Sequence, residues 1–123
     1  QESYDPSMEI VMAIVYAPKG YDYQLFRNIK GVHVDEGASH YADLVREGYH
    51  KYKGIEKILE HFDIEKSACF GDGTNDVDMI RYATIGVAMG QGVQVAKDAS
   101  DFITKSCDEE GITYACKHYE FIK

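Results

Sequence analysis

The segment GDGTND, residues 71–76, gathers the side chains of this sequence that are best suited to chemistry. Asp72 and Asp76 stand four residues apart across a glycine-rich turn, where two carboxylates can share one hard cation such as Mg²⁺, directly or through water. Asn75 lies between them and is suited to orient a ligand oxygen or a neighbouring side chain. The segment therefore predicts a metal site that handles an anionic ligand.

Other interpretations of this segment and of a nearby one carry less weight. Acidic turns with glycine and asparagine are common in surface loops, so a purely structural turn stays open. A calcium loop of the EF-hand type is excluded, because Val77 stands where it needs glycine and Ala83 where it needs glutamate. The GQG of residues 90–92 is a poor dinucleotide fingerprint, because Val95 occupies the place of the third glycine.

The elements around the acidic segment follow a strand–helix alternation. The apolar run SACF, residues 67–70, predicts a short buried strand that delivers Asp72 to the edge of a sheet. Further strands are expected at 84–89 and 101–105, with helices over 77–82 and 93–99 between them. This alternation is typical of a parallel α/β sheet, in which functional groups collect beyond the carboxyl ends of the strands.

Helices are expected on both sides of that alternation. An apolar stripe predicts an amphipathic helix from Lys53 onward, and a second stripe predicts a last helix capped by Asp108. Each stripe is expected to face inward; the first consists of Ile55, Ile58, Leu59 and Phe62, the second of Ile112, Ala115, Cys116 and Tyr119.

The first 50 residues show a different pattern of expected strands and helices. It predicts a strand at 8–17, a short helix at 21–29 and two strands at 31–35 and 40–47 around a turn. We therefore expect a domain boundary between residues 50 and 51. The sheet of the second part would hold only three strands, so we expect more chain, or another chain, to cover its edge.

Composition excludes several classes of protein. The 123 residues carry a net charge of −8, with cations scattered along the chain, which argues against a nucleic-acid partner. No apolar run approaches the roughly 20 residues that cross a bilayer. The three cysteines lack metal or redox spacing and indicate reduced thiols in the cytoplasm. Because the sequence starts at Gln1, with no methionine, we expect residues to be missing upstream.

Four segments in a fixed order resemble the haloacid dehalogenase superfamily, in its Cof-type, sugar-phosphatase-like branch. They are KYKGIEKIL (51–59), GDGTND (71–76), IGVAMG (85–90) and DFITKSCDEEGI (101–112). The resemblance implies that residues 51–123 form the carboxyl-terminal half of a Rossmann-like parallel core. It also implies that residues 1–50 are the second half of an α/β cap domain.

The resemblance also implies roles for single residues. Asp72 resembles the direct Mg²⁺ ligand, Asp76 the second acid, which acts through water, and Asn75 the asparagine that contacts the phosphate or orders the loop. Lys53 resembles the lysine that neutralises the nucleophile and the transferring phosphoryl group, with Lys51 as the alternative if the register differs by two residues.

Half of the family's site is absent from this sequence. The aspartate nucleophile of that family lies in a DxD segment near the amino terminus, and its second motif is a Ser or Thr before the cap; neither has a counterpart here. Gln91 also replaces the usual asparagine of AMGN, with little expected effect on catalysis. We therefore expect the carboxyl-terminal part of a Mg²⁺-dependent phosphatase for small phosphomonoesters such as sugar phosphates, inactive by itself.

Two other classes of protein carry a similar set of acidic residues. A non-catalytic metal- or phosphate-binding domain, or an interaction domain, would keep the half-site without turnover. A phospho-receiver domain is disfavoured, because receivers place a lysine–proline pair after their last strand, whereas no proline follows Pro18.

Overall fold

The structure is a computed structural model that describes residues 7, 10–36 and 40–123. It divides into two compact units, Gln1–Tyr49 and His50–Lys123, one residue from the boundary that the sequence predicts. Each unit is described by itself. Among the described residues, no helix is both long and apolar enough to cross a bilayer.

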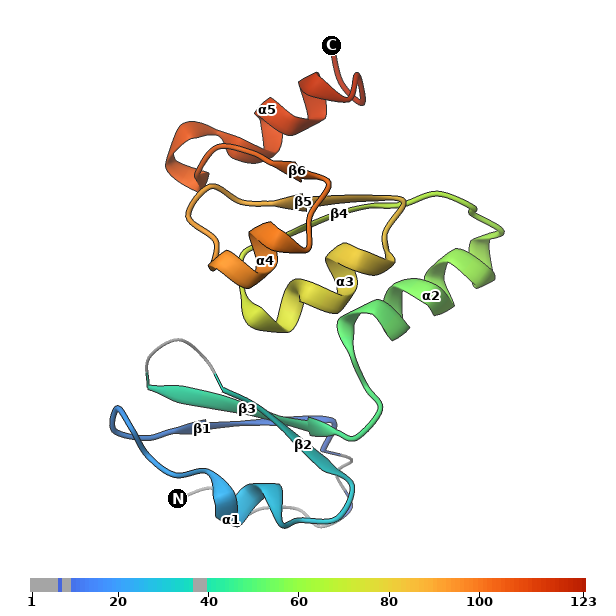
Figure 1. The fold of residues 1–123 in the computed structure, drawn as a ribbon. Coiled ribbons are helices and arrows are strands. Elements are labelled where there is room, and N and C mark those ends of the chain that lie inside the picture. The colour runs from blue at the N-terminus through green and yellow to red at the C-terminus, as the bar shows by residue number, and fades with distance from the viewer. Residues whose placement is uncertain (1–6, 8–9, 37–39) are drawn as a thin grey trace. The chain divides into compact units, whose positions relative to one another are not determined.

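The amino-terminal unit is an antiparallel sheet with one short helix (Figure 1). Its strands have the order β1-β3-β2, and the elements are β1 (Met12–Tyr16), α1 (Gln24–Arg27), β2 (Val32–Glu36) and β3 (Tyr41–Arg46). Tyr23, at the start of α1, is buried together with Val34 and Ala42 of the sheet. The predicted order of strand, helix and hairpin is confirmed, while residues 8–9 and 37–39 lie outside the described residues.

The carboxyl-terminal unit is a parallel α/β sheet, as the sequence predicts. The strand order is β4-β5-β6, and Figure 1 shows α3 and α4 along one face of the strands and α5 on the other side. The elements are α2 (Lys51–Phe62), β4 (Ala68–Gly71), α3 (Val77–Tyr82), β5 (Ile85–Ala88), α4 (Gln94–Asp98), β6 (Phe102–Ile103) and α5 (Gly111–His118), with 3₁₀ turns at Thr74–Asp76 and Cys107–Glu109.

The core of this unit lies between the central strand and α3. Val87 of β5 and Ile80 of α3 are fully buried. Cys69 of β4 is also buried, and this burial raises the pKa of its thiol, although a hydrogen bond with Ser67 opposes the rise. The strand that leads into the acidic segment is therefore anchored by packing just before the segment begins.

Three of the apolar side chains that were expected to face inward do not. Ile58 and Phe62 of α2 are 55% and 65% exposed, and Ile112 of α5 is 54% exposed. Ile55 and Leu59 are half-buried, so α2 contributes only part of its apolar stripe to this unit. The helical period was right, but the period does not say what the stripe packs against.

The start of the last helix also differs from the prediction. Asp108 is not the cap; the 3₁₀ turn Cys107–Glu109 is capped by Ser106, whose hydroxyl donates to Glu109 Oε2 at 2.8 Å. Glu110 then takes a left-handed conformation (φ 57°), and α5 begins at Gly111. A capping box two residues earlier thus replaces the predicted single cap.

Candidate functional site

The acidic segment lies where β4 ends, at the carboxyl edge of the parallel sheet. Gly71 is the last residue of β4, and its carbonyl accepts the N–H of Met89 at 2.9 Å. The carbonyl of Asp72 accepts the N–H of Val93 at 2.8 Å. The loop after β5 therefore holds the backbone on both sides of the Gly71–Asp72 bond.

Asp76 is the anchor of the segment. It is 5% exposed, and its Oδ2 accepts the backbone N–H groups of Asp72 at 2.9 Å and Gly73 at 3.0 Å. Its Oδ1 accepts the Lys51 ammonium at 2.5 Å. Burial alone would raise the pKa of Asp76, but the bonds from Lys51, Gly73 and Asp72 outweigh burial and hold the pKa below its usual value. Asp76 is thus a fixed anion that shapes the turn.

The two candidate lysines point to different neighbours. Lys51, at the start of α2, reaches Asp76, whereas the Lys53 ammonium donates to Glu56 Oε2 at 2.7 Å. That hydrogen bond to Glu56 is the main reason why the pKa of Lys53 is raised. Residues two apart lie on opposite sides of a helix, so only one of the two can face the acidic segment. The geometry favours Lys51, the alternative register, over Lys53.

Asp72 and Asn75 present their side chains to the surface. Both residues are exposed, Asp72 in the loop and Asn75 in the 3₁₀ turn. The carboxylate of Asp72 accepts a hydrogen bond from Gln91 Nε2 at 3.3 Å through its Oδ2 atom. The structure thus brings Asp72, Asp76 and Lys51 together and leaves Lys53 outside the cluster.

This donor set fits a Mg²⁺ ion as one part of its coordination. Both oxygens of Asp76 are already engaged with protein donors, so Asp76 is suited to a place behind the ligands. Asp72 keeps its Oδ1 atom for a metal. Mg²⁺ is usually bound by one or two carboxylates, with waters and substrate phosphate completing the shell. Within the described residues, no three His, Cys, Asp or Glu side chains form a metal-binding group, so the remaining ligands would come from elsewhere.

Gly71 is required by the close approach of Asp76. A Cβ atom at position 71 would lie 2.4 Å from the Cβ of Asp76. We expect Gly71→Ala to displace Asp76 and to destabilise the fold by about 1–3 kcal/mol, the usual cost of overpacking. Urea unfolding measures the change.

Gly54→Ala is the matched control for this substitution. Gly54 lies in α2, and a Cβ atom there would meet no heavy atom within 4 Å. Because alanine favours a helix over glycine by about 1 kcal/mol, this control should not lower the urea midpoint. Equal destabilisation by the two variants would contradict the close contact at Gly71.

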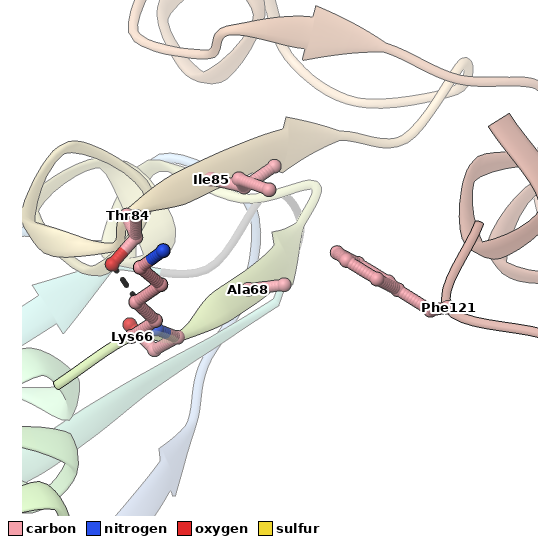
Figure 2. Close-up of a pocket in the computed structure, with 6 residues that line it drawn as sticks. Lys66, Ala68, Thr84, Ile85 and Phe121 are labelled. Atoms are coloured by element: carbon pink, nitrogen blue, oxygen red, sulfur yellow. Dashed lines mark hydrogen bonds between the residues drawn. The ribbon is translucent and has the colours of Figure 1, made fainter. Parts of the chain in front are cut away.

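A cavity of about 300 Å³ lies away from the acidic segment. Figure 2 shows Phe121 facing Ala68 and Ile85, the first residues of β4 and β5, and the bond that Ser67 N–H donates to Thr84 Oγ1. The cavity is therefore at the amino ends of strands whose carboxyl ends carry the site. Its lining offers little polar chemistry.

Comparison with known proteins agrees with this arrangement. The chain is 46% identical over 83 residues to the candidate phosphatase YkrA of Bacillus subtilis, covering 66% of this chain and 32% of YkrA. It is 32% identical over 82 residues to the Bacillus subtilis protein YitU, a 5-amino-6-(5-phospho-D-ribitylamino)uracil phosphatase, covering 65% of this chain and 30% of YitU.

Solved structures extend the likeness to nearly the whole chain. A subclass IIB sugar phosphatase of the haloacid dehalogenase superfamily superposes with a TM-score of 0.83 at 35% identity, covering 94% of this chain and 45% of that protein. The chain thus spans less than half of this structure. The family model for haloacid dehalogenase-like hydrolases matches residues 6–116. The chain belongs to the haloacid dehalogenase-like hydrolase family.

Proposed function

We propose that this chain is the carboxyl-terminal part of a Mg²⁺-dependent phosphatase that acts on small phosphomonoesters such as sugar phosphates. One observation carries the proposal: the carboxyl end of β4 combines an exposed carboxylate, Asp72, with an ion pair between the buried Asp76 and the exposed Lys51. The names of YitU and of the sugar phosphatase, both phosphatases of small molecules, support this substrate class.

Each side chain of the cluster has a role in this proposal. Bound at Asp72, Mg²⁺ would neutralise charge on the phosphate oxygens. Asp76 holds the turn that presents Asp72, and Lys51 adds a positive charge beside it. Asn75 is placed to contact the phosphate or to order the loop. Phosphoryl transfer depends mainly on such positioning and charge stabilisation.

The nucleophile of the reaction would come from outside these residues. An aspartate would take the phosphoryl group from the ester oxygen, the alcohol would leave, and water would then hydrolyse the aspartyl-phosphate. Within the described residues β4 pairs with β5 alone, so its other edge is open to a further strand. The exposed Ile58 and Phe62 of α2 likewise offer apolar surface to additional chain.

The two units take different parts in the proposal. Residues 1–50 would be the second half of an α/β cap that selects the leaving group, and residues 51–123 the second half of the catalytic core. The free thiols of Cys69, Cys107 and Cys116 support a reducing, cytoplasmic location.

Phosphate release by the full-length protein tests the proposal. We expect hydrolysis of a panel of sugar phosphates that stops when EDTA removes the metal and resumes when Mg²⁺ is restored. These residues expressed alone should release no phosphate. If the full-length protein binds Mg²⁺ and phosphate but hydrolyses no ester, the proposal of a phosphatase is wrong and a non-catalytic binding domain takes its place.

A further inference from the structure

Gln91 lies in the loop after β5 and connects the acidic segment to a third loop of the site's edge. Its Nε2 donates to Asp72 Oδ2 at 3.3 Å, and its Oε1 accepts the backbone N–H of Cys107 at 3.0 Å. Asp72 follows β4, and Cys107 opens the turn that follows β6. One side chain therefore joins the carboxyl ends of all three strands of the parallel sheet.

The chemistry of the two partners fixes the orientation of the Gln91 amide. A backbone N–H such as that of Cys107 only donates, so it must face the amide oxygen. An ionised carboxylate only accepts, so Asp72 must face the NH₂ group. A flipped amide would place two donors together at Cys107 and two acceptors together at Asp72.

The backbone on both sides of Gln91 packs closely against neighbouring loops. A Cβ atom on Gly90 would lie 2.7 Å from the nitrogen of Ser106, and a Cβ atom on Gly92 would lie 3.1 Å from the Cα of Asp72. The Gly90 N–H also donates to the carbonyl of Lys105 at 3.0 Å. The loop is thus closely packed on both sides of Gln91, and this packing fixes the backbone position from which the Gln91 side chain extends.

We propose that Gln91 is a positioning residue that sets the carboxylate of Asp72 for metal binding. By occupying Oδ2, Gln91 would favour one rotamer of Asp72, in which Oδ1 would be the atom that holds the metal. Mutation of a residue that orients a metal ligand in this way typically lowers metal affinity by about 10- to 100-fold. The inference rests on the proposed function in taking Asp72 as a Mg²⁺ ligand.

The test compares Gln91→Leu with Gln94→Leu in the full-length protein. Gln94 is a matched control, because its exposed Nε2 donates to Asp98 Oδ1 at 2.7 Å within α4, whereas the Nε2 of Gln91 donates to Asp72. Calorimetric titration of the substrate-free protein with Mg²⁺ is the first readout. We expect affinity to fall about tenfold in Gln91→Leu and to stay at the wild-type value in Gln94→Leu.

Kinetics supply a second readout that a structural role would not move. In Gln91→Leu the Mg²⁺ concentration for half-maximal rate should rise by a similar factor, while kcat recovers at saturating Mg²⁺ and KM for the sugar phosphate stays constant. A lowered urea midpoint of the metal-free protein with unchanged Mg²⁺ affinity would overturn the inference, because Gln91 would then only stabilise the loops.

The outcomes separate this inference from the proposed function. If the wild-type protein binds Mg²⁺ but hydrolyses no phosphomonoester, the proposed function fails, and the calorimetric comparison still decides the role of Gln91. If the wild type hydrolyses the ester and Gln91→Leu binds Mg²⁺ as tightly, only the role of Gln91 fails. A wild-type protein that binds no Mg²⁺ would contradict both.

Discussion

Replacing Lys51 by methionine in the full-length protein is expected to lower kcat by about 10²- to 10³-fold, the range seen when one charge-stabilising donor is removed. Methionine keeps an unbranched side chain of nearly the same length and removes its charge. The ammonium of Lys51 lies on Asp76, at the edge where the phosphoryl group would bind. Steady-state kinetics with a sugar phosphate at saturating Mg²⁺ measures the loss.

Lys53→Met is the matched control for that result. Lys53 stands two residues away on the same helix, and its ammonium is held by Glu56. We expect its kcat to remain near the wild-type value. A large loss of kcat in Lys53→Met with none in Lys51→Met would contradict the assignment of Lys51. The catalytic lysine would then be Lys53, as the family resemblance implies.

Asp72→Asn should have the largest effect, a loss of kcat of about 10³-fold or more, because a bound metal contributes several kcal/mol of charge stabilisation. The substitution keeps the shape of the side chain and the backbone N–H that Asp76 accepts. The turn should therefore persist while the negative charge is lost. Rates of phosphate release and calorimetric Mg²⁺ titration measure the two consequences together.

Asp78→Asn is the control for charge alone. Asp78 is an exposed carboxylate in the first turn of α3, close to the acidic segment in sequence. Asp78 does not belong to the cluster of Asp72, Asp76 and Lys51, and we expect normal Mg²⁺ binding and turnover in this variant. If both variants lost Mg²⁺ binding equally, net charge rather than a ligand at Asp72 would explain the effect.

The parallel sheet could be predicted from the sequence because its signals are local. Short apolar runs bounded by glycine or polar residues mark β4 and β5, and the helical pattern of residues 77–82 matches α3. The position of Asp72 follows from the same logic, since it comes directly after β4. These features depend on residues that are close to one another in the chain, so their patterns can be recognised in the sequence.

Features that depend on distant residues could not be predicted in the same way. The choice between Lys51 and Lys53 is decided by a contact across 25 positions, and the role of Gln91 by contacts across 19 and 16 positions. Lys51 could be found from the sequence, because it was the alternative to Lys53 if the register differed by two residues. The signal for Gln91 in the sequence was its departure from AMGN, for which little effect on catalysis was expected.

The most direct test of the whole account is a crystal structure of the full-length protein with Mg²⁺ and tungstate, an analogue of phosphate. We expect Mg²⁺ bonded to the Asp72 carboxylate at about 2.0–2.1 Å. The Lys51 ammonium should lie within hydrogen-bond distance of Asp76 or the bound anion, with Asp76 separated from the metal by a water. Mg²⁺ and tungstate bound away from Asp72, or met by Lys53 in place of Lys51, would contradict it.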